Sequence, residues 1–477
     1  MNEQIEYALI GGERVVSERT IEVLNPSTAE VLAVTADCGS REIDLAVRSA
    51  AAAQKIWKKV AVPERARLLR VVAHLILRDL EELAQLESLQ TGKPIAQGRR
   101  DAELTARYFD FYASAVETFY GGSFYLDERT QVVTSFEPHG VTAHIIPWNY
   151  PLQIMGRSVA PALATGNCTV VKPAEETPLT ALKLATLVAE AGLPPGAMNV
   201  VPGLGETAGA ALTAHPGIGH ISFTGSVEVG RLIAHAAAEL LIPATLELGG
   251  KSPNIVFADA DLDRAVPIIA NSILQNGGQT CSAGSRLIVE RSFHDEVVRR
   301  LSEVFAGVVI GPALENPGLG PMISSPQRER VLSYIEIGAD EGTVLCGGKA
   351  LRGGRFGEGF FVEPTIIDGV DARSRVFQEE IFGPVLVVTS FDSVDEAVDL
   401  ANATEFALVA GVWTTNINTA QRMVREVVSG QVFVNSYGAS GGVELPFGGF
   451  KHSGYGREKG AEGLRGFVQT KTSVIVS

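Results

Sequence analysis

Cys281 stands in the stretch QNGGQTCSAGS, among small, polar and glycine residues. Taken alone, a cysteine is more often a small buried hydrophobe than a reactive group. Two other segments change that balance, because IIPWNYP carries the amide of Asn149 and LELGGKSP carries the carboxylate of Glu247, followed by two glycines. A thiol, an amide donor and a carboxylate can act together as nucleophile, oxyanion stabiliser and base. The three segments contain no histidine for a papain-like pair, so we predict a nucleophile that works with these two groups.

Two further segments could hold an anionic cofactor. FTGSVEVGRLI runs from a predicted strand into a predicted helix, and N–H groups at the start of that helix, beside Thr224, Gly225 and Ser226, would bind a pyrophosphate. An ordinary helix cap at Ser226 explains the same residues. GLGETA matches the dinucleotide pattern G-x-G-x-x-A, and a plain turn between a strand and a helix explains it equally well.

The segment VVKPAEETP leaves a predicted strand with Lys172 and Glu175 in a proline-stiffened turn. An acid at the end of a strand can accept the two hydroxyls of a ribose and would repel a 2′-phosphate. If this is an adenosine site, NAD is favoured over NADP. The alternative is that both side chains are exposed charges on a loop.

The elements that must position these groups are short apolar strands that alternate with helices from residue 140 onward. Such alternation predicts βαβ units and a parallel, doubly wound sheet. A second alternating series includes predicted strands over 252–257, 286–290, 385–391 and 432–436. The chain is therefore predicted to be α/β, with two halves that meet near 247–252. Ligands of such sheets bind beyond the carboxyl ends of the strands.

The front of the chain is predicted to be helical over 41–57 and 63–88, where apolar residues recur at helical spacing. A hairpin of two short strands is predicted over 123–138, around the polar tip DER. A hairpin of this size is marginal in water on its own, so we expect it to dock on something. A helix is also predicted to start near Asp261, ahead of the cysteine segment.

Composition limits the classes of function. The 477 residues are enough for two or three domains, and 45% hydrophobic with 20% charged residues excludes a mainly disordered chain. A net charge of -15 argues against nucleic acid or an anionic membrane as partner. Four widely separated cysteines show no zinc or disulfide spacing, and no signal peptide or long apolar run is present. We therefore expect a cytoplasmic protein that binds small molecules or other chains and no metal.

Seven segments in order resemble the signature segments of the NAD(P)-dependent aldehyde dehydrogenase superfamily: IIPWNYP, VVKPAEETP, FTGS, LELGGKSP, NGGQTC, EEIFGPV and PFGGFKHSGYGRE. The resemblance extends from NPSTAEVLA to the last predicted strand. It implies an aldehyde dehydrogenase-like fold, with two doubly wound parallel-sheet domains and a small β oligomerisation domain. The implied boundaries are 1–121 and 141–248 for the NAD-binding domain, 249–452 for the catalytic domain, 453–467 packing back on the NAD-binding domain, and 122–140 with 468–477 for oligomerisation.

The resemblance also implies a mechanism. Cys281 attacks the aldehyde, and the oxyanion is held by the amide of Asn149 and the backbone N–H of Cys281. After hydride leaves for the nicotinamide, Glu247 deprotonates the water that hydrolyses the thioester. Glu458 matches a secondary proton-relay position, but several family members carry a lysine where this chain has Ser158, so that role stays open.

For the cofactor, the resemblance implies NAD rather than NADP. Lys172 and Glu175 match contacts to the adenosine ribose, Ser226 matches a pyrophosphate contact, and Glu380 with Phe382 matches the nicotinamide-ribose end. The other implied cofactor contacts are Ile146, Pro147, Trp148, Gly209, Phe223, Gly225, Val229 and Leu248. The family does not rely on G-x-G-x-x-G, which makes GLGETA a structural turn.

Substrate contacts are implied at Arg157, Glu444 and Phe447. Arg157 stands where several family members carry an aromatic residue, and Glu444 lies in the loop YGASGGVEL. One hypothesis is that Arg157 or Glu444 recognises a charged group of the substrate. The alternative is that the two pair with each other or face water. The aldehyde itself is not predicted.

The predicted function is NAD-dependent oxidation of an aldehyde to a carboxylate by a homo-oligomer, either a dimer or a tetramer. An NADP-dependent semialdehyde dehydrogenase is disfavoured by Glu175, and a CoA-acylating enzyme is disfavoured by Glu247. A crystallin-like structural protein would be expected to lose Cys281, Asn149 or Glu247, all of which are present. A cysteine hydrolase without NAD would leave FTGS and EEIFGPV unexplained.

Overall fold

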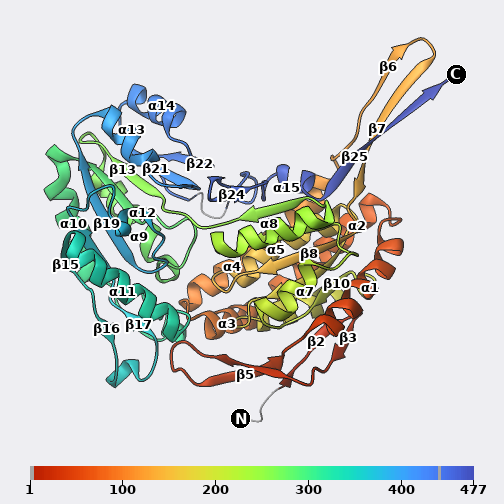
Figure 1. Ribbon diagram of the computed structural model, residues 1–477, viewed down its shortest axis with the longest axis horizontal. Helices are drawn as coiled ribbons and strands as arrows, with labels where there is room; N and C mark the ends of the chain where they lie inside the picture. Colours follow the sequence, from red (N-terminus) through yellow and green to blue (C-terminus); the bar gives the residue numbers. More distant parts are fainter. Residues whose placement is uncertain (1–4, 439–441) are drawn as a thin grey trace.

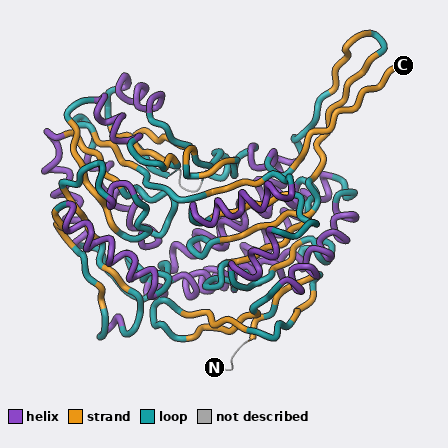
Figure 2. Tube along the Cα trace, viewed as in Figure 1, coloured by secondary structure: helices purple, strands orange, loops and turns teal. Residues whose placement is uncertain are grey.

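A computed structural model of the chain describes residues 5–438 and 442–477. Two large sheets, each with helices packed against it, form the body of the molecule (Figures 1 and 2). Most strands in both sheets are parallel, so the prediction of an α/β fold with two parallel sheets is confirmed. In the part of the chain that the structure describes, no helix is both long and apolar enough to cross a membrane.

The first large sheet has the strand order β24-β12-β11-β8-β9-β10-β2-β3. Its central strands β12, β11, β8, β9 and β10 pair in parallel. Strands β9 and β11 are buried along their whole length, as expected for a parallel sheet covered on both faces. The strand bounds are β2 (Ala8–Ile10), β3 (Glu13–Val15), β8 (Val141–Ile146), β9 (Cys168–Pro173), β10 (Met198–Val200), β11 (His220–Thr224), β12 (Ala244–Glu247) and β24 (Gly454–Tyr455).

The helices that accompany this sheet include the predicted front helices. The segment predicted as helical over 63–88 forms two helices, because the chain leaves the helical region at Asp79 (φ -98°, ψ 22°). The carboxylate of Asp79 pairs with Arg78 and Lys183, which holds this break in place. The helices are α1 (Ser40–Trp57), α2 (Val62–Arg78), α3 (Leu80–Thr91), α4 (Ile95–Val116), α5 (Pro151–Ala164), α6 (Leu179–Glu190), α7 (Ala210–Thr213) and α8 (Val227–Leu240).

The second large sheet has the strand order β15-β18-β19-β14-β13-β21-β22, and only β15 pairs antiparallel. Strands β14 and β19 match the predicted ranges, whereas β22 ends two residues early because Asn435 adopts a left-handed conformation (φ 51°). Asp261 caps the predicted helix by accepting from two backbone N–H groups. The strand bounds are β13 (Pro253–Val256), β14 (Arg286–Glu290), β15 (Thr343–Cys346), β18 (Thr365–Asp368), β19 (Val385–Phe391), β21 (Val409–Trp413) and β22 (Gln431–Val434).

Further helices and small sheets complete the molecule. The helices are α9 (Leu262–Leu274), α10 (His294–Ala306), α11 (Ser325–Glu341), α12 (Arg375–Gln378), α13 (Val394–Asn402), α14 (Ile417–Glu426) and α15 (Glu462–Arg465). One small sheet has the strand order β1 (Ile5–Glu6), β5 (Val31–Ala36) and β4 (Thr20–Leu24). Two further sheets have two strands each: β16 (Ala350–Leu351) with β17 (Phe361–Val362), and β20 (Phe406–Ala407) with β23 (Phe450–Lys451).

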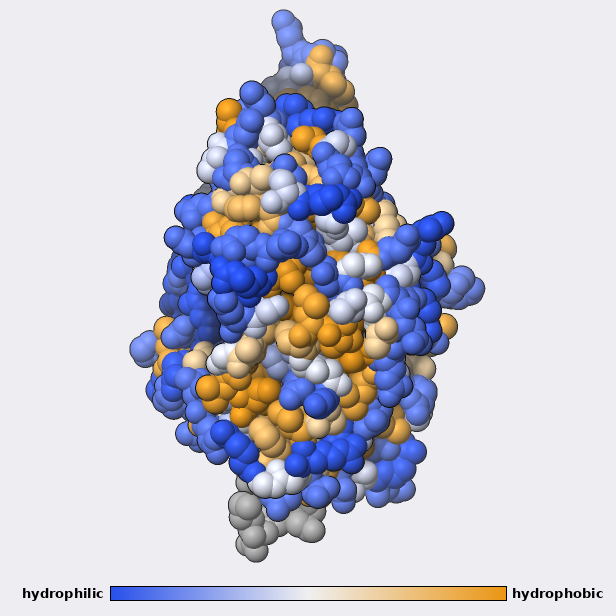
Figure 3. Space-filling view, turned by 90° about the vertical axis from the view of Figure 1, so that its left-hand side faces the viewer, coloured by the Kyte–Doolittle hydropathy of each residue, from blue (hydrophilic) through white to orange (hydrophobic). Residues whose placement is uncertain are grey.

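A three-stranded ribbon projects from the body. It consists of β6 (Ser123–Asp127), β7 (Thr130–Pro138) and β25 (Val468–Val476), in the order β25-β7-β6. The hairpin predicted over 123–138 therefore docks on the last strand, which pairs with β7 over nine positions. Figure 1 shows the ribbon standing clear of both sheets, and its tip also rises above the body in Figure 3.

Candidate active site

The carboxyl ends of four parallel strands gather the predicted groups at one edge of the first sheet. Strands β8, β9, β11 and β12 are neighbours in the sheet and run in the same direction. The chain leaving their ends carries, in turn, Asn149, Lys172, Gly225 and Glu247, the last being the final residue of β12. The second sheet begins six residues beyond this glutamate, with β13. The edge where the predicted groups gather is therefore also the junction between the two sheets.

A tight loop positions Cys281 at this junction. A short 3-10 helix, η2 (Gln275–Gly278), ends with left-handed backbone at Asn276 (φ 49°) and at the two glycines that follow it, which turns the chain back toward β14. On the other side, a Cβ atom at Gly250 would overlap the carbonyl oxygen of Cys281. Only glycine allows this close approach, so the LELGG segment and the cysteine loop are packed backbone against backbone.

Hydrogen bonds fix Asn149 beside the cysteine loop. Its side chain is only 4% exposed, and its Nδ2 donates to the carbonyl oxygen of Gln279 at 2.9 Å. In return, the amide of Asn276 donates to the backbone carbonyl of Asn149 at 2.9 Å. The backbone N–H of Cys281 donates to no acceptor among the described residues. A second N–H of the Asn149 amide and this backbone N–H are the two donors that remain beside the thiol.

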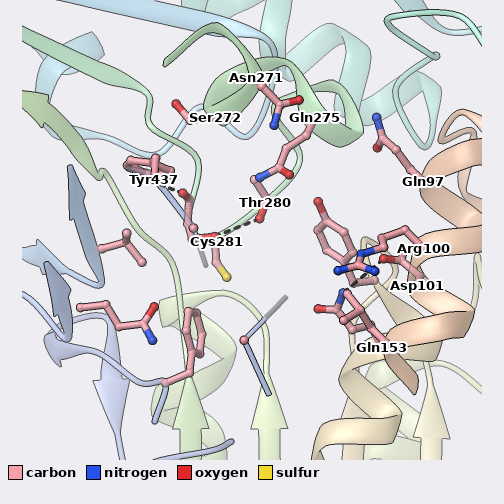
Figure 4. Close-up of a pocket in the computed structure, with 18 of the residues that line it drawn as sticks. Gln97, Arg100, Asp101, Gln153, Asn271, Ser272, Gln275, Thr280, Cys281 and Tyr437 are labelled. Atoms are coloured by element: carbon pink, nitrogen blue, oxygen red, sulfur yellow. Dashed lines mark hydrogen bonds between the residues drawn. The ribbon is translucent and has the colours of Figure 1, made fainter. Parts of the chain in front are cut away.

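Cys281 opens onto a cavity of about 540 Å³ between the two halves of the molecule. In Figure 4 its sulfur points into this cavity, and helix α4 forms the opposite wall with Gln97, Arg100 and Asp101. Arg157 and Phe447, two of the predicted substrate contacts, also line it. Amide side chains are frequent in the wall; they are Gln97, Asn149, Gln153, Asn271, Gln275 and Gln431.

Glu247 is fully buried next to the cavity rather than in its wall. Neither of its carboxylate oxygens has a hydrogen-bond partner in the described part of the chain. Burial first, and then the negative charge of Glu458, raise the pKa of Glu247 well above its usual range. A raised pKa makes the carboxylate form of this group a stronger base than that of an exposed glutamate, as suits a general base.

The thiol itself lies in an environment of mixed charge. Burial raises the pKa of Cys281 to about 12, while the guanidinium of Arg157 works in the opposite direction. The carboxylate of Glu247 raises the thiol pKa further. Burial therefore favours the thiol over the thiolate even with the neighbouring cations present.

Arg157, in the cavity wall, forms a buried ion pair with Glu458. Both side chains are almost completely buried, and the hydroxyl of Ser222 donates to the same carboxylate at 3.2 Å. Burial lowers the pKa of Arg157, but the carboxylates of Glu458 and Glu247 outweigh this and raise it overall. The guanidinium also lies 5.2 Å from the ring centre of Phe447. Arg157 thus has a counterion within the protein.

Glu444 does not join this cluster. It pairs with Arg107 on helix α4, both side chains are about half exposed, and it is absent from the described lining of the cavity. Arg157 and Glu444 therefore neither pair with each other nor share an environment. The central residues of the predicted substrate loop that carries Glu444, residues 439–441, lie outside the described residues.

The predicted adenosine-ribose residues lie together at the end of β9. Lys172 is 3% exposed, and its Nζ donates to the carbonyl of Pro173 at 2.9 Å and pairs with Glu175 at 3.4 Å. Burial lowers the pKa of Lys172, partly offset by that carboxylate. Gly209 packs against the stem of the lysine side chain. A buried ammonium beside a partly exposed carboxylate can bind a vicinal diol by donating and accepting hydrogen bonds.

The predicted pyrophosphate residues lie at the start of α8. Ser226 is the N-cap, and its hydroxyl accepts from the N–H of Val229 at 3.2 Å. A Cβ atom at Gly225 would overlap the ring of Phe223, which is buried. Because Gly225 has no side chain, this ring can pack against the backbone just before the helix. Leu248 packs under the same helix turn, against Gly230. The remaining N–H groups of this first turn can hold an anion.

A third group of predicted cofactor residues spans the junction. The ring of Trp148 meets the ring of Phe382 edge to face, with centres 5.3 Å apart. Phe382 has a left-handed backbone (φ 64°), which is unusual for an aromatic residue. Glu380 accepts from the N–H of Gly250 at 2.8 Å, and burial raises its pKa to about 7. Ile146 is the last residue of β8, and Pro147 connects it to Trp148.

The sequence interpretation missed five cavity residues with titratable side chains, which are Arg100, Asp101, Tyr150, Tyr437 and Lys459. Lys459 lines the cavity, and its Nζ lies 4.8 Å from the ring centre of Phe447. The one available signal was its place directly after Glu458 in GREKG. The segment GLGETA forms a π-helical turn (Gly205–Gly209) that leads into α7.

Comparisons with known proteins agree with this geometry. The model of the aldehyde dehydrogenase family matches residues 15–473, so the chain belongs to the aldehyde dehydrogenase family. This confirms the predicted family and the predicted class of enzyme.

Solved structures give the same answer. A candidate aldehyde dehydrogenase from Burkholderia cenocepacia is 47% identical, with a TM-score of 0.97 over 98% of this chain and 99% of that one. An aldehyde dehydrogenase from Bacillus cereus, solved as an NAD⁺ complex, is 40% identical, with a TM-score of 0.96 over 99% and 97%. An NAD-dependent aldehyde dehydrogenase from Sinorhizobium meliloti is 38% identical, with a TM-score of 0.96 over 99% and 95%.

Proposed function

We propose that the protein oxidises an aldehyde to the carboxylic acid with NAD, through a covalent adduct on Cys281. The observation that supports this most directly is the meeting of three groups at one junction. The thiol points into a cavity, the amide of Asn149 is hydrogen-bonded to the same loop, and the unpartnered carboxyl of Glu247 lies buried beside them. Nucleophile, oxyanion donors and base are thus held by the cysteine loop and by the ends of the two strands β8 and β12.

In the first step the Cys281 thiolate attacks the aldehyde carbon, and negative charge develops on the aldehyde oxygen. The free N–H of the Asn149 amide and the backbone N–H of Cys281 are the donors for this oxygen. Both are held by the surrounding hydrogen bonds, so little reorganisation is needed as the charge forms.

The residues present fit NAD as cofactor. The ammonium of Lys172 with the carboxylate of Glu175 would hold the adenosine ribose, and the first turn of α8 would hold the pyrophosphate. Glu380 would accept from the nicotinamide ribose. When bound, NAD supplies the hydride acceptor that converts the thiohemiacetal on Cys281 into a thioester.

Hydrolysis of the thioester is assigned to Glu247. Because burial raises the pKa of this carboxyl well above its usual range, its carboxylate form is a stronger base than an exposed glutamate. It takes a proton from water, and the resulting hydroxide attacks the thioester carbon and releases the acid and the thiolate. The same residue speaks against CoA as the usual acceptor, because water would compete for the thioester.

The cavity also favours a class of aldehyde. Its wall carries many amides and few aromatic rings, the latter being Tyr150, Tyr437 and Phe447. Amides that face a bound apolar chain would lose hydrogen bonds to water without replacement. We therefore propose a substrate that carries hydrogen-bonding groups, to be identified among aliphatic, aromatic, amino and semialdehyde compounds by NADH formation.

The domain boundaries given above stay a prediction. We propose that the first large sheet is the core of an NAD-binding domain and the second the core of a catalytic domain. The pairing of β24 with β12 supports the assignment of 453–467 to the first of these. The projecting ribbon is assigned to assembly of a homo-oligomer in the cytoplasm.

The nucleophile is tested by Cys281→Ala. We expect NADH formation to fall on the order of a thousandfold or more with every active aldehyde, because no other thiol opens onto the cavity in the described part of the chain. NAD binding by calorimetry should be unchanged, which separates loss of the nucleophile from loss of the fold. NADH formation at the wild-type rate would show that the assignment is wrong.

A further inference from the structure

The wall of the cavity in front of Cys281 carries an excess of positive charge. Its charged side chains are the cations Arg100, Arg157 and Lys459 and the carboxylate Asp101. A charge that faces an enclosed space must be balanced by another charge or stay hydrated, because enclosing it alone costs free energy. The partners of these four groups therefore indicate what the cavity can bind.

Asp101 and Arg157 are balanced by buried partners within the protein. The carboxylate of Asp101 pairs with Lys93, whose side chain is completely buried, and accepts from the amide of Gln153 at 3.2 Å. The guanidinium of Arg157 pairs with Glu458, and the two side chains are 4% and 3% exposed. Neither group therefore needs a charged group on the substrate.

The other two cations of the wall differ in their partners. Arg100 pairs with Glu103 at 3.4 Å, and its side chain is 52% exposed, so water also reaches it. The ammonium of Lys459 forms no ion pair and no hydrogen bond within the described part of the chain. Residues 439–441, which lie outside that part, include no acidic residue in the sequence.

The close contact of the Lys459 ammonium is an aromatic ring. Its Nζ lies 4.8 Å from the ring centre of Phe447, and both residues line the cavity. A ring attracts a cation, but it does not accept the strong hydrogen bonds that a carboxylate accepts. The N–H groups of Lys459 therefore stay available to a ligand in the cavity.

We propose that Lys459 binds a carboxylate of the substrate, and that the protein oxidises aldehydes that carry this carboxylate at their other end. The inference rests on the proposed function, because it needs Cys281 to hold the aldehyde end. A carboxylate would accept charge-assisted hydrogen bonds from the ammonium and balance its charge. A neutral aldehyde of the same size would displace water from the ammonium without replacing it. The substrate class is thus the semialdehydes of dicarboxylic acids.

The cavity has room for such a substrate between its two ends. The sulfur of Cys281 points into the cavity (Figure 4), whose volume of about 540 Å³ exceeds that of a chain of a few carbons. The aldehyde end loses its hydride to NAD and gains an oxygen from water, while the carboxylate at Lys459 is unchanged. The product is a dicarboxylate. The residue that recognises the charge is then neither Arg157, which has its own counterion, nor Glu444, which is itself negative.

The charge of Lys459 gives this preference a pH dependence. Burial, followed by the like charge of Arg157, lowers the pKa of Lys459 to about 8, while Cys281, Glu458 and Glu247 act to raise it. The ammonium is therefore charged below pH 8 and loses its charge above it. We expect the preference for the carboxylate to be constant below about pH 8 and to fall as the pH rises further. The ratio of two aldehydes cancels the titration of Cys281 and Glu247, which both substrates share.

The test compares kcat/KM for aldehydes of equal length with and without the carboxylate. The pairs are succinic semialdehyde with butanal, glutaric semialdehyde with pentanal, and adipic semialdehyde with hexanal, each followed by NADH formation. We expect the wild type to prefer the charged member of at least one pair. In Lys459→Gln that preference should fall on the order of tenfold to a hundredfold, mainly through KM for the charged aldehyde. Lys459→Arg keeps the charge and should keep most of the preference.

Two further variants separate this assignment from its alternatives. Arg100→Gln removes a cation from the opposite wall of the cavity (Figure 4) and should keep the preference, because Arg100 already pairs with Glu103. Cys281→Ala allows binding without chemistry, with succinate, glutarate and adipate as calorimetric probes. Adding Lys459→Gln to Cys281→Ala should weaken the tightest of these on the order of tenfold or more.

Three results would overturn the proposal: a wild type that prefers the charged member of no pair, an equal loss for charged and neutral aldehydes in Lys459→Gln, or a preference lost in Arg100→Gln and kept in Lys459→Gln. Thermal unfolding shows which variants are folded, and Lys459→Met replaces the glutamine variant if that variant does not fold. Failure of the proposed function is a different outcome, because it would appear as folded wild-type protein that forms NADH from no aldehyde.

Discussion

At the scale of single residues, burial favours the proposed role of Glu247 but opposes that of Cys281. Burial raises the pKa of Glu247, which makes its carboxylate a better base, but the same burial raises the pKa of Cys281 and opposes the thiolate. The positive charges of Arg157 and Lys459 lower the pKa of the thiol, but burial has the larger effect.

The residues that could be predicted from sequence stand in short segments rich in glycine or proline. Asn149 and Glu247 lie at the ends of apolar strands, and Cys281 lies in the glycine-containing loop after an apolar helix. Lys459 was not predicted, because it reaches the cavity only after the chain returns through β24 to pair beside β12. Likewise, the counterions of Arg157 and Glu444 come from segments distant in sequence, which no local pattern specifies.

Glu175 gives a residue-scale prediction about the cofactor. Its carboxylate, paired with Lys172 and partly exposed, would repel the 2′-phosphate of NADP. In Glu175→Gln we expect the ratio of kcat/KM for NADP to that for NAD to rise on the order of tenfold. Initial rates with both cofactors measure it. Equal kcat/KM for the two cofactors in the wild type would remove this argument.

At the scale of elements, the alternation of strands and helices was predictable because strands buried on both faces are apolar along their length. The break at Asp79 was not, since the apolar spacing continues across it and only the ion pairs to Arg78 and Lys183 mark it. The end of β22 depends on one left-handed residue, Asn435. The spacing of apolar residues predicts where helices and strands occur. The residue at which each helix or strand ends depends instead on the backbone conformation of single residues.

The contact between the LELGG turn and the cysteine loop gives a prediction at this scale. In Gly250→Ala the new methyl group would overlap the carbonyl oxygen of Cys281, so either the loop or the turn must move. We expect a loss of about 1–3 kcal/mol in the free energy of unfolding and a clear fall in kcat. Thermal and urea unfolding, with NADH assays, measure both.

Gly205→Ala is the matched control, because a Cβ atom there meets nothing within 4 Å. Gly205 also begins the turn formed by GLGETA, so the control tests whether that segment holds the cofactor. Unchanged KM for NAD is expected. If Gly205→Ala weakened NAD binding while Gly250→Ala had no effect, our assignment of both turns would be wrong.

At the scale of the whole molecule, the projecting ribbon is too exposed to be explained by the single chain. Every residue of β6 is exposed, and so are nearly all residues of β25. Below the polar tip, Figure 3 shows hydrophobic side chains on the ribbon. Both outer strands present unpaired edges, which commonly join another sheet. These features support a homo-oligomer built through the ribbon.

The double variant Leu126→Asp with Ile475→Asp tests this. Both side chains are more than half exposed in the single chain, at 67% and 53%, so the charges should not unfold it. We expect wild-type protein to sediment as an assembly and the variant as a smaller species. Ile417→Asp, at 65% exposure on the first turn of α14, is the control and should assemble normally. A wild-type protein that sediments as a monomer would contradict the assignment.

The most direct test of the central claim is the mass of the Cys281 peptide after Glu247→Gln is mixed with NAD and an active aldehyde. Without its base, the enzyme should release a burst of NADH and then stall, because the thioester is formed but not hydrolysed. We predict a mass increase equal to the acyl group on the peptide that contains Cys281, and on no other cysteine peptide. Full steady-state turnover with an unmodified Cys281 would contradict the account.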